Sequence, residues 1–261
     1  MIHEMHESDG SLTLLRFERL AASDGLVHAV ASRPHNYAPH RGTERDRARD
    51  ARRALCEKLG LSFERLTAPA QVMGAEVLPI LPDDVGRGRD GRDAAIPFVD
   101  GLVCDIPGVP LMLLSADCPL IAVYDPDRPA VGAVHASWQG TLAGGAGNLI
   151  RQMQRVFGSD PAQLSAAIAP SAGPCCYEVG PEVRRLAETR WAEPDRFVFE
   201  RGSRHVLDLW AANRAQLIEA GLQADSIECA GPCTICDDRF WSHRRQGADA
   251  GRTALILALR G

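Results

Sequence analysis

The alternation of short apolar runs with helical patterns constrains the fold of this chain most. It is clearest in the middle of the sequence, where four apolar runs come before one long helical pattern. The runs are Gly101–Cys104, Leu111–Ser115, Leu120–Tyr124 and Ala130–His135, and the helical spacing extends from Leu142 to Phe157, before Gly158. Short apolar runs bounded by turn residues are typical of buried strands. This order predicts one α/β or α+β domain over residues 1–261, layered α/β/α, in which helices cover a mixed sheet.

The flanking segments fit the same pattern. Further strands are predicted at Leu12–Phe17, Leu26–Ser32, Leu164–Ile168, Ile227–Ala230, Phe240–Arg244 and Thr253–Leu259, and further helices at Thr43–Leu59 and Leu209–Ala220. Asp208 can cap the last of these helices, and Gly221 follows its end. Pro82–Pro97 is rich in Gly, Arg and Asp without an apolar period, which predicts an exposed loop.

The cationic side chains are almost all arginine. Of the 29 Lys and Arg residues, Lys58 is the one Lys, which leaves 28 Arg. No glycine loop precedes Lys58, so the lysine chemistry of Schiff-base enzymes, P-loop NTPases and protein kinases is excluded. A net charge of −5 without a basic run argues against nucleic acid or an anionic membrane as a partner.

The hydropathy of the chain predicts a cytoplasmic protein. No segment approaches the roughly 20 apolar residues of a membrane span, and Met1–Gly10 lacks the apolar core of a signal peptide. The eight cysteines are therefore expected to be thiols or ligands rather than disulfides.

A turn in the middle of the chain brings two reactive residue types together. Asp125–Pro129 is a strong turn signal, and a five-residue loop would pair Tyr124 with Ala130. Cys118 then lies beside His135 at one end of a hairpin.

Taken singly, either residue favours a structural role, but together with Asp117 they predict a catalytic or metal site. Thiolate and imidazole suit zinc or copper, and equally suit a thiolate nucleophile with an imidazole base.

Other candidate groups are less specific. Ser137–Thr141 leads into a helix whose N-terminus could bind an anion, or is an ordinary turn. Arg244, Arg245 and Arg252 could grip a phosphate or form surface salt bridges. Cys233-Thr-Ile-Cys236 has the spacing of one half of a zinc ribbon, but the adjacent pair Cys175-Cys176 does not supply the other half. These cysteines are therefore expected to pack in the fold or to form the wall of a site, and a redox role is the less favoured alternative.

Five motifs from about Leu66 onward resemble the multi-copper polyphenol oxidase (laccase-domain) family, also called YfiH-like. They are Ala116–Pro119, Val134–Gly140, Gly173–Gly180, Leu207–Leu217, and Cys233–Cys236 with Ser242–Arg245 and Gly251-Arg252. About forty N-terminal residues match poorly. The resemblance implies a layered α/β/α fold and a zinc ion held by His, Cys and His. It also implies phosphorolysis of purine nucleosides such as adenosine, inosine and methylthioadenosine, and adenosine deamination. A small-molecule nucleoside and phosphate are then its partners. The fold is also similar to that of toxins that act as cysteine hydrolases.

Two positions depart from the family pattern. Cys118 and His135 match two metal ligands, but Met73 of Gln71-Val-Met-Gly74 stands where the family has its third, a His. A thioether is a poor zinc ligand and an acceptable one for Cu(I). Gln139 stands where the family has Arg, which removes a charge near an anionic substrate. His243 could supply the missing imidazole.

Three hypotheses follow from these residues. The first is a purine nucleoside enzyme with a metal, zinc or copper, at Cys118 and His135. Gln71, Gln139, Arg244, Arg245 and Arg252 are then its candidate substrate and phosphate ligands. The second is a metal-free cysteine hydrolase. The third is a non-catalytic relative that has lost its metal ligand at Met73.

Overall fold

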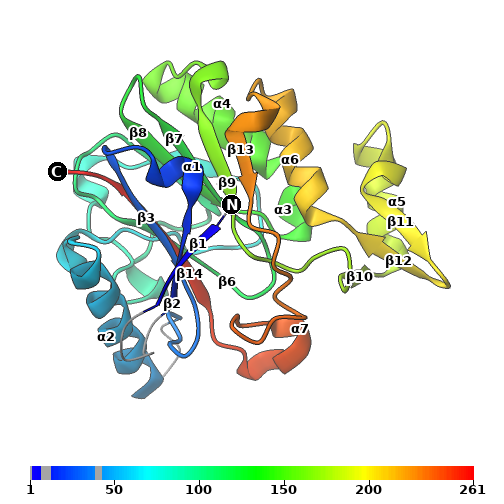
Figure 1. The fold of residues 1–261 in the computed structure, drawn as a ribbon, viewed down its shortest axis with the longest axis horizontal. Coiled ribbons are helices and arrows are strands. Elements are labelled where there is room, and N and C mark those ends of the chain that lie inside the picture. The colour runs from blue at the N-terminus through cyan, green and yellow to red at the C-terminus, as the bar shows by residue number, and fades with distance from the viewer. Residues whose placement is uncertain (1, 7–12, 39–42) are drawn as a thin grey trace.

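Two β-sheets packed face to face form the centre of the molecule, and helices cover their outer faces (Figure 1). The computed structural model describes residues 2–6, 13–38 and 43–261. Met1, residues 7–11 and the start of the strand predicted at Leu12 lie outside these ranges. Among the described helices, none is long and apolar enough to cross a membrane.

The first sheet is antiparallel and has five strands in the order β1-β2-β3-β14-β6. They are β1 (Ile2–His6), β2 (Thr13–Phe17), β3 (Leu26–Ala31), β14 (Thr253–Leu259) and β6 (Leu111–Ser115). Short helix α1 (Glu18–Ala21) follows β2. Every residue of β14 is buried, because this strand pairs on both sides and is covered on both faces.

The second sheet is mixed and has six strands in the order β13-β9-β7-β8-β5-β4. They are β13 (Ile227–Cys229), β9 (Ser165–Ile168), β7 (Leu120–Asp125), β8 (Ala130–His135), β5 (Gly101–Cys104) and β4 (Val77–Pro79). The β13/β9 and β4/β5 pairs are parallel, and the others are antiparallel.

The apolar faces of the sheets and helices account for the layers. Side chains such as Val30, Leu102 and Leu255 fill the space between the two sheets. Helix α2 (Thr43–Lys58) buries Leu55 against the outer face of the first sheet. Helices α4 (Gly145–Phe157) and α6 (Leu209–Glu219) cover the second sheet, so the β layer of this α/β/α arrangement holds two sheets.

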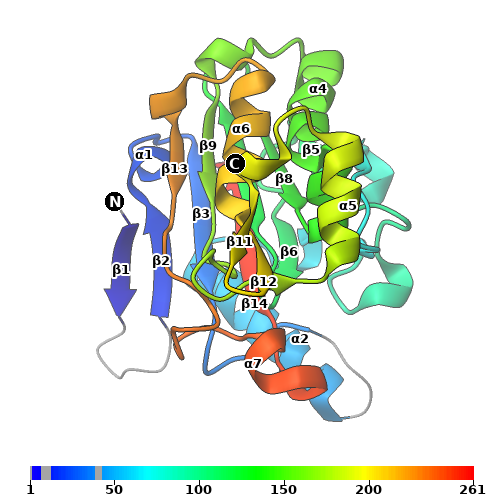
Figure 2. The ribbon, with the colours of Figure 1, turned by 90° about the vertical axis from the view of Figure 1, so that its right-hand side faces the viewer.

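A smaller unit projects from the side of this body (Figures 1 and 2). It holds the sheet β10-β12-β11 and helix α5 (Pro181–Arg190) around its own apolar cluster. The strands are β10 (Glu178–Val179), β11 (Val198–Arg201) and β12 (Arg204–Leu207). No element was predicted here from the sequence, because these strands are short and their charged residues break the alternation of apolar side chains.

Two predicted elements differ in the structure. Phe240–Arg244 is not a strand, because Ser242 caps helix α7 (His243–Gln246) by accepting a hydrogen bond from the amide of Arg245. The helix expected from Leu142 onward begins earlier, as α3 (Trp138–Leu142), and is interrupted at Gly144, whose φ of 82° is left-handed.

Candidate active site

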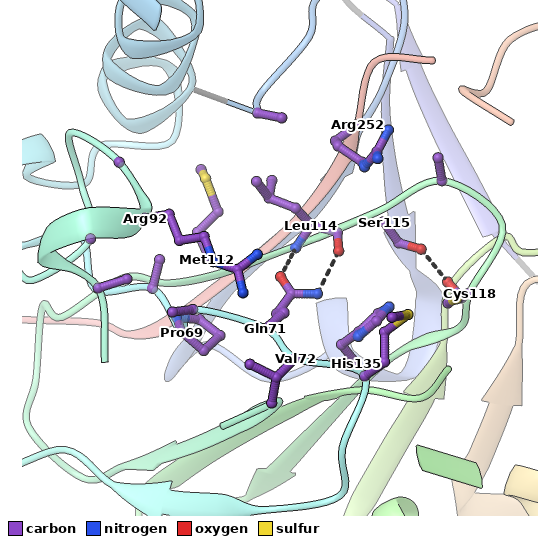
Figure 3. Close-up of a pocket in the computed structure, with 18 of the residues that line it drawn as sticks. Pro69, Gln71, Val72, Arg92, Met112, Leu114, Ser115, Cys118, His135 and Arg252 are labelled. Carbon is purple, nitrogen blue, oxygen red and sulfur yellow. Dashed lines mark hydrogen bonds between the residues drawn. The ribbon is translucent and has the colours of Figure 1, made fainter. Parts of the chain in front are cut away.

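The hairpin that carries Cys118 and His135 forms as predicted, but its register differs by one residue. Strand β7 extends to Asp125, which pairs with Ala130 and leaves residues 126–129 as the loop. Oδ1 of Asp125 accepts hydrogen bonds of 3.0 Å from the amides two and three residues further on, so the turn closes around this side chain. Cys118 nevertheless lies next to His135, and the two side chains are drawn side by side in Figure 3.

A buried carboxylate, Asp100, connects His135 to a neighbouring loop. Its Oδ1 lies 2.8 Å from Nδ1 of His135. The same carboxylate accepts hydrogen bonds from the amides of Val72 and Met73 at 3.0 Å and of Gly74 at 2.7 Å. One side chain therefore fixes both the imidazole ring and the loop that faces it.

Sequence reasoning did not single out Asp100. The signal that could have found it is an acidic residue directly before the wholly apolar run Gly101–Cys104. A carboxylate there is buried by the pairing of β5 with β8 and needs partners.

Burial and charge act in opposite directions on this pair. Burial alone would lower the pKa of His135, but Cys118 and Asp100 raise it to about 9. Burial alone would raise the pKa of Asp100, but His135 and the amides of Val72 and Gly74 hold it below its ordinary value. The ring of His135 is therefore protonated at neutral pH and its partner carboxylate is ionised.

Cys118 and His135 lie at one end of a cavity of about 680 Å³, a size suited to a small-molecule ligand (Figure 3). Its walls include apolar side chains such as Pro69, Met112 and Leu114. Polar lining groups include Gln71, Arg92, Ser115, His243 and Arg252. Part of the segment Pro82–Pro97, predicted as a plain exposed loop, also forms a wall of this cavity.

The three predicted phosphate-binding arginines have different surroundings. Arg252 lines the cavity, where burial lowers the pKa of its guanidinium. Arg245 instead donates to four main-chain carbonyls between residues 234 and 240. Arg244 stacks on the Tyr177 ring at 5.0 Å, and neither it nor Arg245 lines the cavity.

Arg92 is a cavity residue that the sequence analysis missed. It lies on a loop without periodicity, among many arginines, so no pattern set it apart.

Asp117 does not line the cavity. Oδ1 accepts a hydrogen bond of 2.7 Å from the Thr234 hydroxyl, and Oδ2 accepts one of 2.6 Å from the amide of Arg244. Its backbone is left-handed, with φ of 91°. These contacts favour a positioning role for Asp117 over the predicted catalytic one.

The two predicted glutamines also differ in their positions. The Gln71 amide lines the cavity but pairs with the backbone of Leu114, donating at 2.7 Å and accepting at 2.9 Å, so it fastens its loop to β6. Gln139 is exposed on α3 and does not line the cavity. The amide of Gly140, in the first turn of α3, donates to the Ser137 hydroxyl, which caps this helix.

The donors around Cys118 and His135 do not fit the three-ligand zinc site of the resemblance. Met73 lines the cavity with them, but it offers a thioether and is 56% exposed. His243 lines the same cavity. Among the described residues, however, its ring nitrogens do not form a group with Cys118 and His135 in which all ligand atoms lie within 4.8 Å of one another.

Comparison with known proteins decides the family. The family described as multi-copper polyphenol oxidoreductase laccase matches residues 23–260. The chain belongs to this family. The resemblance predicted from the five motifs is thereby confirmed. The description of this laccase-like family suggests a metal, and the described residues include a cysteine cluster that could hold one.

Individual members of the laccase-like family are similar over most of the chain. It is 36% identical over 229 residues to purine nucleoside phosphorylase YlmD of Geobacillus stearothermophilus, covering 87% of this chain and 82% of that protein. It is 32% identical to adenosine deaminase RL5 of an unknown prokaryotic organism, covering 84% of each. The crystal structure of YlmD from Geobacillus stearothermophilus superimposes with a TM-score of 0.90 at 31% identity, covering 100% of both chains. The predicted α/β fold class is therefore confirmed.

Proposed function

We propose that this protein is an enzyme acting on purine nucleosides, by phosphorolysis of adenosine, inosine or methylthioadenosine, with adenosine deamination as a related activity. The observation that carries the proposal is the group Cys118, His135 and Asp100 at one end of a cavity that also presents Arg252. The similarity to proteins named purine nucleoside phosphorylase and adenosine deaminase supports the choice of substrate.

Arg252 and His135 each have a defined part in phosphorolysis. A phosphate oxygen forms a bond to C1′ of the ribose, the bond from C1′ to the purine nitrogen breaks, and the purine leaves with a proton. Arg252, one of the arginines on the cavity wall, binds the phosphate. His135 carries a proton at neutral pH because Cys118 and Asp100 raise its pKa to about 9, so it serves as the general acid for the leaving purine.

The test is direct. Purified protein incubated with inosine or adenosine and phosphate should release the free base and ribose 1-phosphate. Cys118→Ala and His135→Ala should each reduce this release at least tenfold. No product from adenosine, inosine or methylthioadenosine, with and without added zinc or copper, would contradict the proposal.

A second function is favoured by one observation, the chain of contacts from Asp100 to His135 to Cys118. A carboxylate that orients an imidazole beside a thiol is the arrangement of cysteine hydrolases. In that case Cys118 attacks an acyl substrate, and iodoacetamide labels it faster than Cys229, which is similarly part-buried. Equal labelling of both residues would exclude this function. Inactivity in both assays would leave a binding protein without catalysis.

A further inference from the structure

Four cysteines outside the cavity meet at one place in the fold. Strands β9 and β13 are parallel neighbours, so the chain leaves both at the same edge of the sheet. A bridge between Ser171 and Cys233 continues this pairing beyond the strands. The turn with Cys175 and Cys176 therefore lies against the turn with Cys233 and Cys236. The sequence predicted packing or a site wall for these cysteines, whereas the structure brings all four sulfur atoms together.

The sulfur atoms have the spacing of ligands around one ion. Sγ of Cys236 lies 3.2 Å from Sγ of Cys176 and 3.6 Å from Sγ of Cys175. All four sulfurs, including that of Cys233, lie within 4.8 Å of one another. Thiolates around tetrahedral zinc, with Zn–S of about 2.3 Å, are separated by about 3.8 Å. Both distances from Cys236 are somewhat shorter than that value, and both are longer than the roughly 2.05 Å of a disulfide.

A backbone donor contacts the most buried of these sulfurs. Gly173 donates its amide to Sγ of Cys233 at 3.2 Å. Amide donors to sulfur stabilise a thiolate over a thiol. The turn is thus arranged for an anionic ligand at Cys233.

Two guanidinium groups flank the cluster. Arg201 donates to the carbonyls of Cys175 and Pro174 at 2.8 and 2.7 Å, and Arg245 donates to those of Thr234 and Ile235 at 3.0 and 3.1 Å. Four thiolates around a divalent ion carry a net charge of −2. The two arginines, one beside each turn, offset that charge.

We propose that Cys175, Cys176, Cys233 and Cys236 bind a single zinc ion that fastens the two turns together. Binding displaces the thiol protons to solvent and involves no redox step. A tetrahedral set of four sulfurs is a closed structural site, because no position is left for water or substrate. This site is separate from the one at Cys118 and His135 and does not depend on the nucleoside activity.

The ion would also hold the loop that carries Cys118. Thr234, between the ligands of the second turn, donates its hydroxyl to Asp117. Ala172, just before the first turn, donates its amide to the carbonyl of Asp117 at 2.7 Å. Both bonds attach Asp117, the neighbour of Cys118, to the two turns that the ion joins. Removal of zinc should therefore loosen this loop as well as the turns themselves.

Zinc content is the first measurement. The full-length protein, purified under reducing conditions without chelator, should contain one zinc per chain at this cluster by elemental analysis. Cys236→Ser and Cys175→Ser, both at exposed positions, should lose that zinc at least tenfold. Cys229→Ser, at the end of β13 and outside the cluster, and Cys118→Ser, in the cavity, should keep it.

Two further measurements do not require the cluster variants to fold. Zinc-edge X-ray absorption of the Cys118→Ser variant should show four sulfur ligands at about 2.3 Å. In the unsubstituted protein, iodoacetamide should label the four cluster cysteines only after a chelator has removed the zinc. Any of four results would overturn the proposal. Two concern the zinc content: zinc retained in Cys236→Ser, or no zinc in the reduced protein. The other two are nitrogen among the zinc ligands and a disulfide among the four cysteines.

Discussion

At the scale of single residues, Asp100 connects more of the candidate site than any residue singled out from the sequence. It accepts a hydrogen bond from His135 and three from loop amides, and its side chain is fully buried. A neutral amide of the same shape cannot accept all of these bonds or stabilise the imidazolium. The chemistry at Cys118 and the position of the loop therefore both depend on this one negative charge.

Asp100→Asn should accordingly reduce nucleoside turnover by on the order of 10²–10⁴-fold and the free energy of unfolding by about 1–3 kcal/mol. Steady-state kinetics and urea denaturation measure the two effects. Asp105→Asn, an exposed position just beyond the other end of β5, is the matched control and should change neither. Unchanged kinetics in Asp100→Asn would show that the carboxylate does not act on His135.

The protonation of His135 predicts how stability depends on pH. Its pKa rises from 6.5 to about 9 on folding, so the folded state binds the proton more tightly than the unfolded chain does. The stabilisation is fully present below pH 6.5 and is lost as the pH rises through about 9. Urea denaturation from pH 6 to pH 10 should show this loss, and His135→Gln should remove it. An identical pH profile in the variant would contradict the assignment.

Met73 gives a prediction about metal binding in the cavity. Its backbone φ of 62° is left-handed, a conformation that His adopts more readily than most residues. Met73→His should complete a set of His, Cys and His and add one zinc per chain to the content of the unsubstituted protein. The double variant with Cys118→Ala should not gain this zinc. If the single variant Met73→His gains no zinc, residues of the cavity other than Met73 have also diverged from the family pattern.

At the scale of elements, the contact of α3 with the loop 71–74 determines how closely this loop approaches the hairpin. A Cβ atom at Gly140 would collide with the carbonyl oxygen of Gly74. This oxygen belongs to the backbone, so it cannot shift without a loss of stability. Ser137 adds a hydrogen bond of 3.2 Å from its hydroxyl to the carbonyl of Met73. The absence of a side chain at Gly140 is thus a requirement of this contact.

Gly140→Ala should therefore lower the free energy of unfolding by about 1–3 kcal/mol and should reduce turnover by displacing the loop. Gln139→Ala, the exposed neighbour on the same helix, should remain within about 0.5 kcal/mol of the unsubstituted protein. Chemical denaturation of the three proteins checks this. Equal stability of Gly140→Ala would mean that α3 shifts freely.

The elements that sequence analysis predicted well carry their signals locally. Helix α6 begins after Asp208, whose carboxylate accepts from the amide of Ala211 at 2.9 Å, and it ends near Gly221, as expected. The hairpin was predicted correctly from its turn. Its register was not, because it depends on which main-chain amides hydrogen-bond to the side chain of Asp125. The strand predicted at Phe240–Arg244 was wrong, because hydrophobicity alone does not reveal that Ser242 caps a helix.

At the scale of the whole molecule, contacts between distant segments were beyond sequence analysis. The cysteine cluster forms because β9 and β13 are parallel neighbours, and no local pattern specifies which strands pair. The same holds for Asp100 and His135, which meet only when β5 pairs with β8. The family motifs identified Cys118 and His135, whereas the positions of Arg244, Arg245 and Gln139 outside the cavity required the structure.

Strand β14 gives a prediction for the molecule as a whole, because it joins β3 to β6 and faces the second sheet. Leu255 is fully buried in the core between the sheets. Leu255→Ala should lower the free energy of unfolding by about 2–5 kcal/mol. Ile218→Ala on α6, where the side chain is 37% exposed, should cost much less. Comparable losses in the two variants would show that the contact between the sheets contributes little to stability.

The place of β14 in the chain also affects how the protein is made. β3 and β6 leave the ribosome long before β14, and until β14 arrives the facing edges of both strands have no partner. Unpaired edges of buried strands are sites of aggregation. A chain that ends upstream of Thr253–Leu259 is therefore expected to aggregate, because neither edge can be covered.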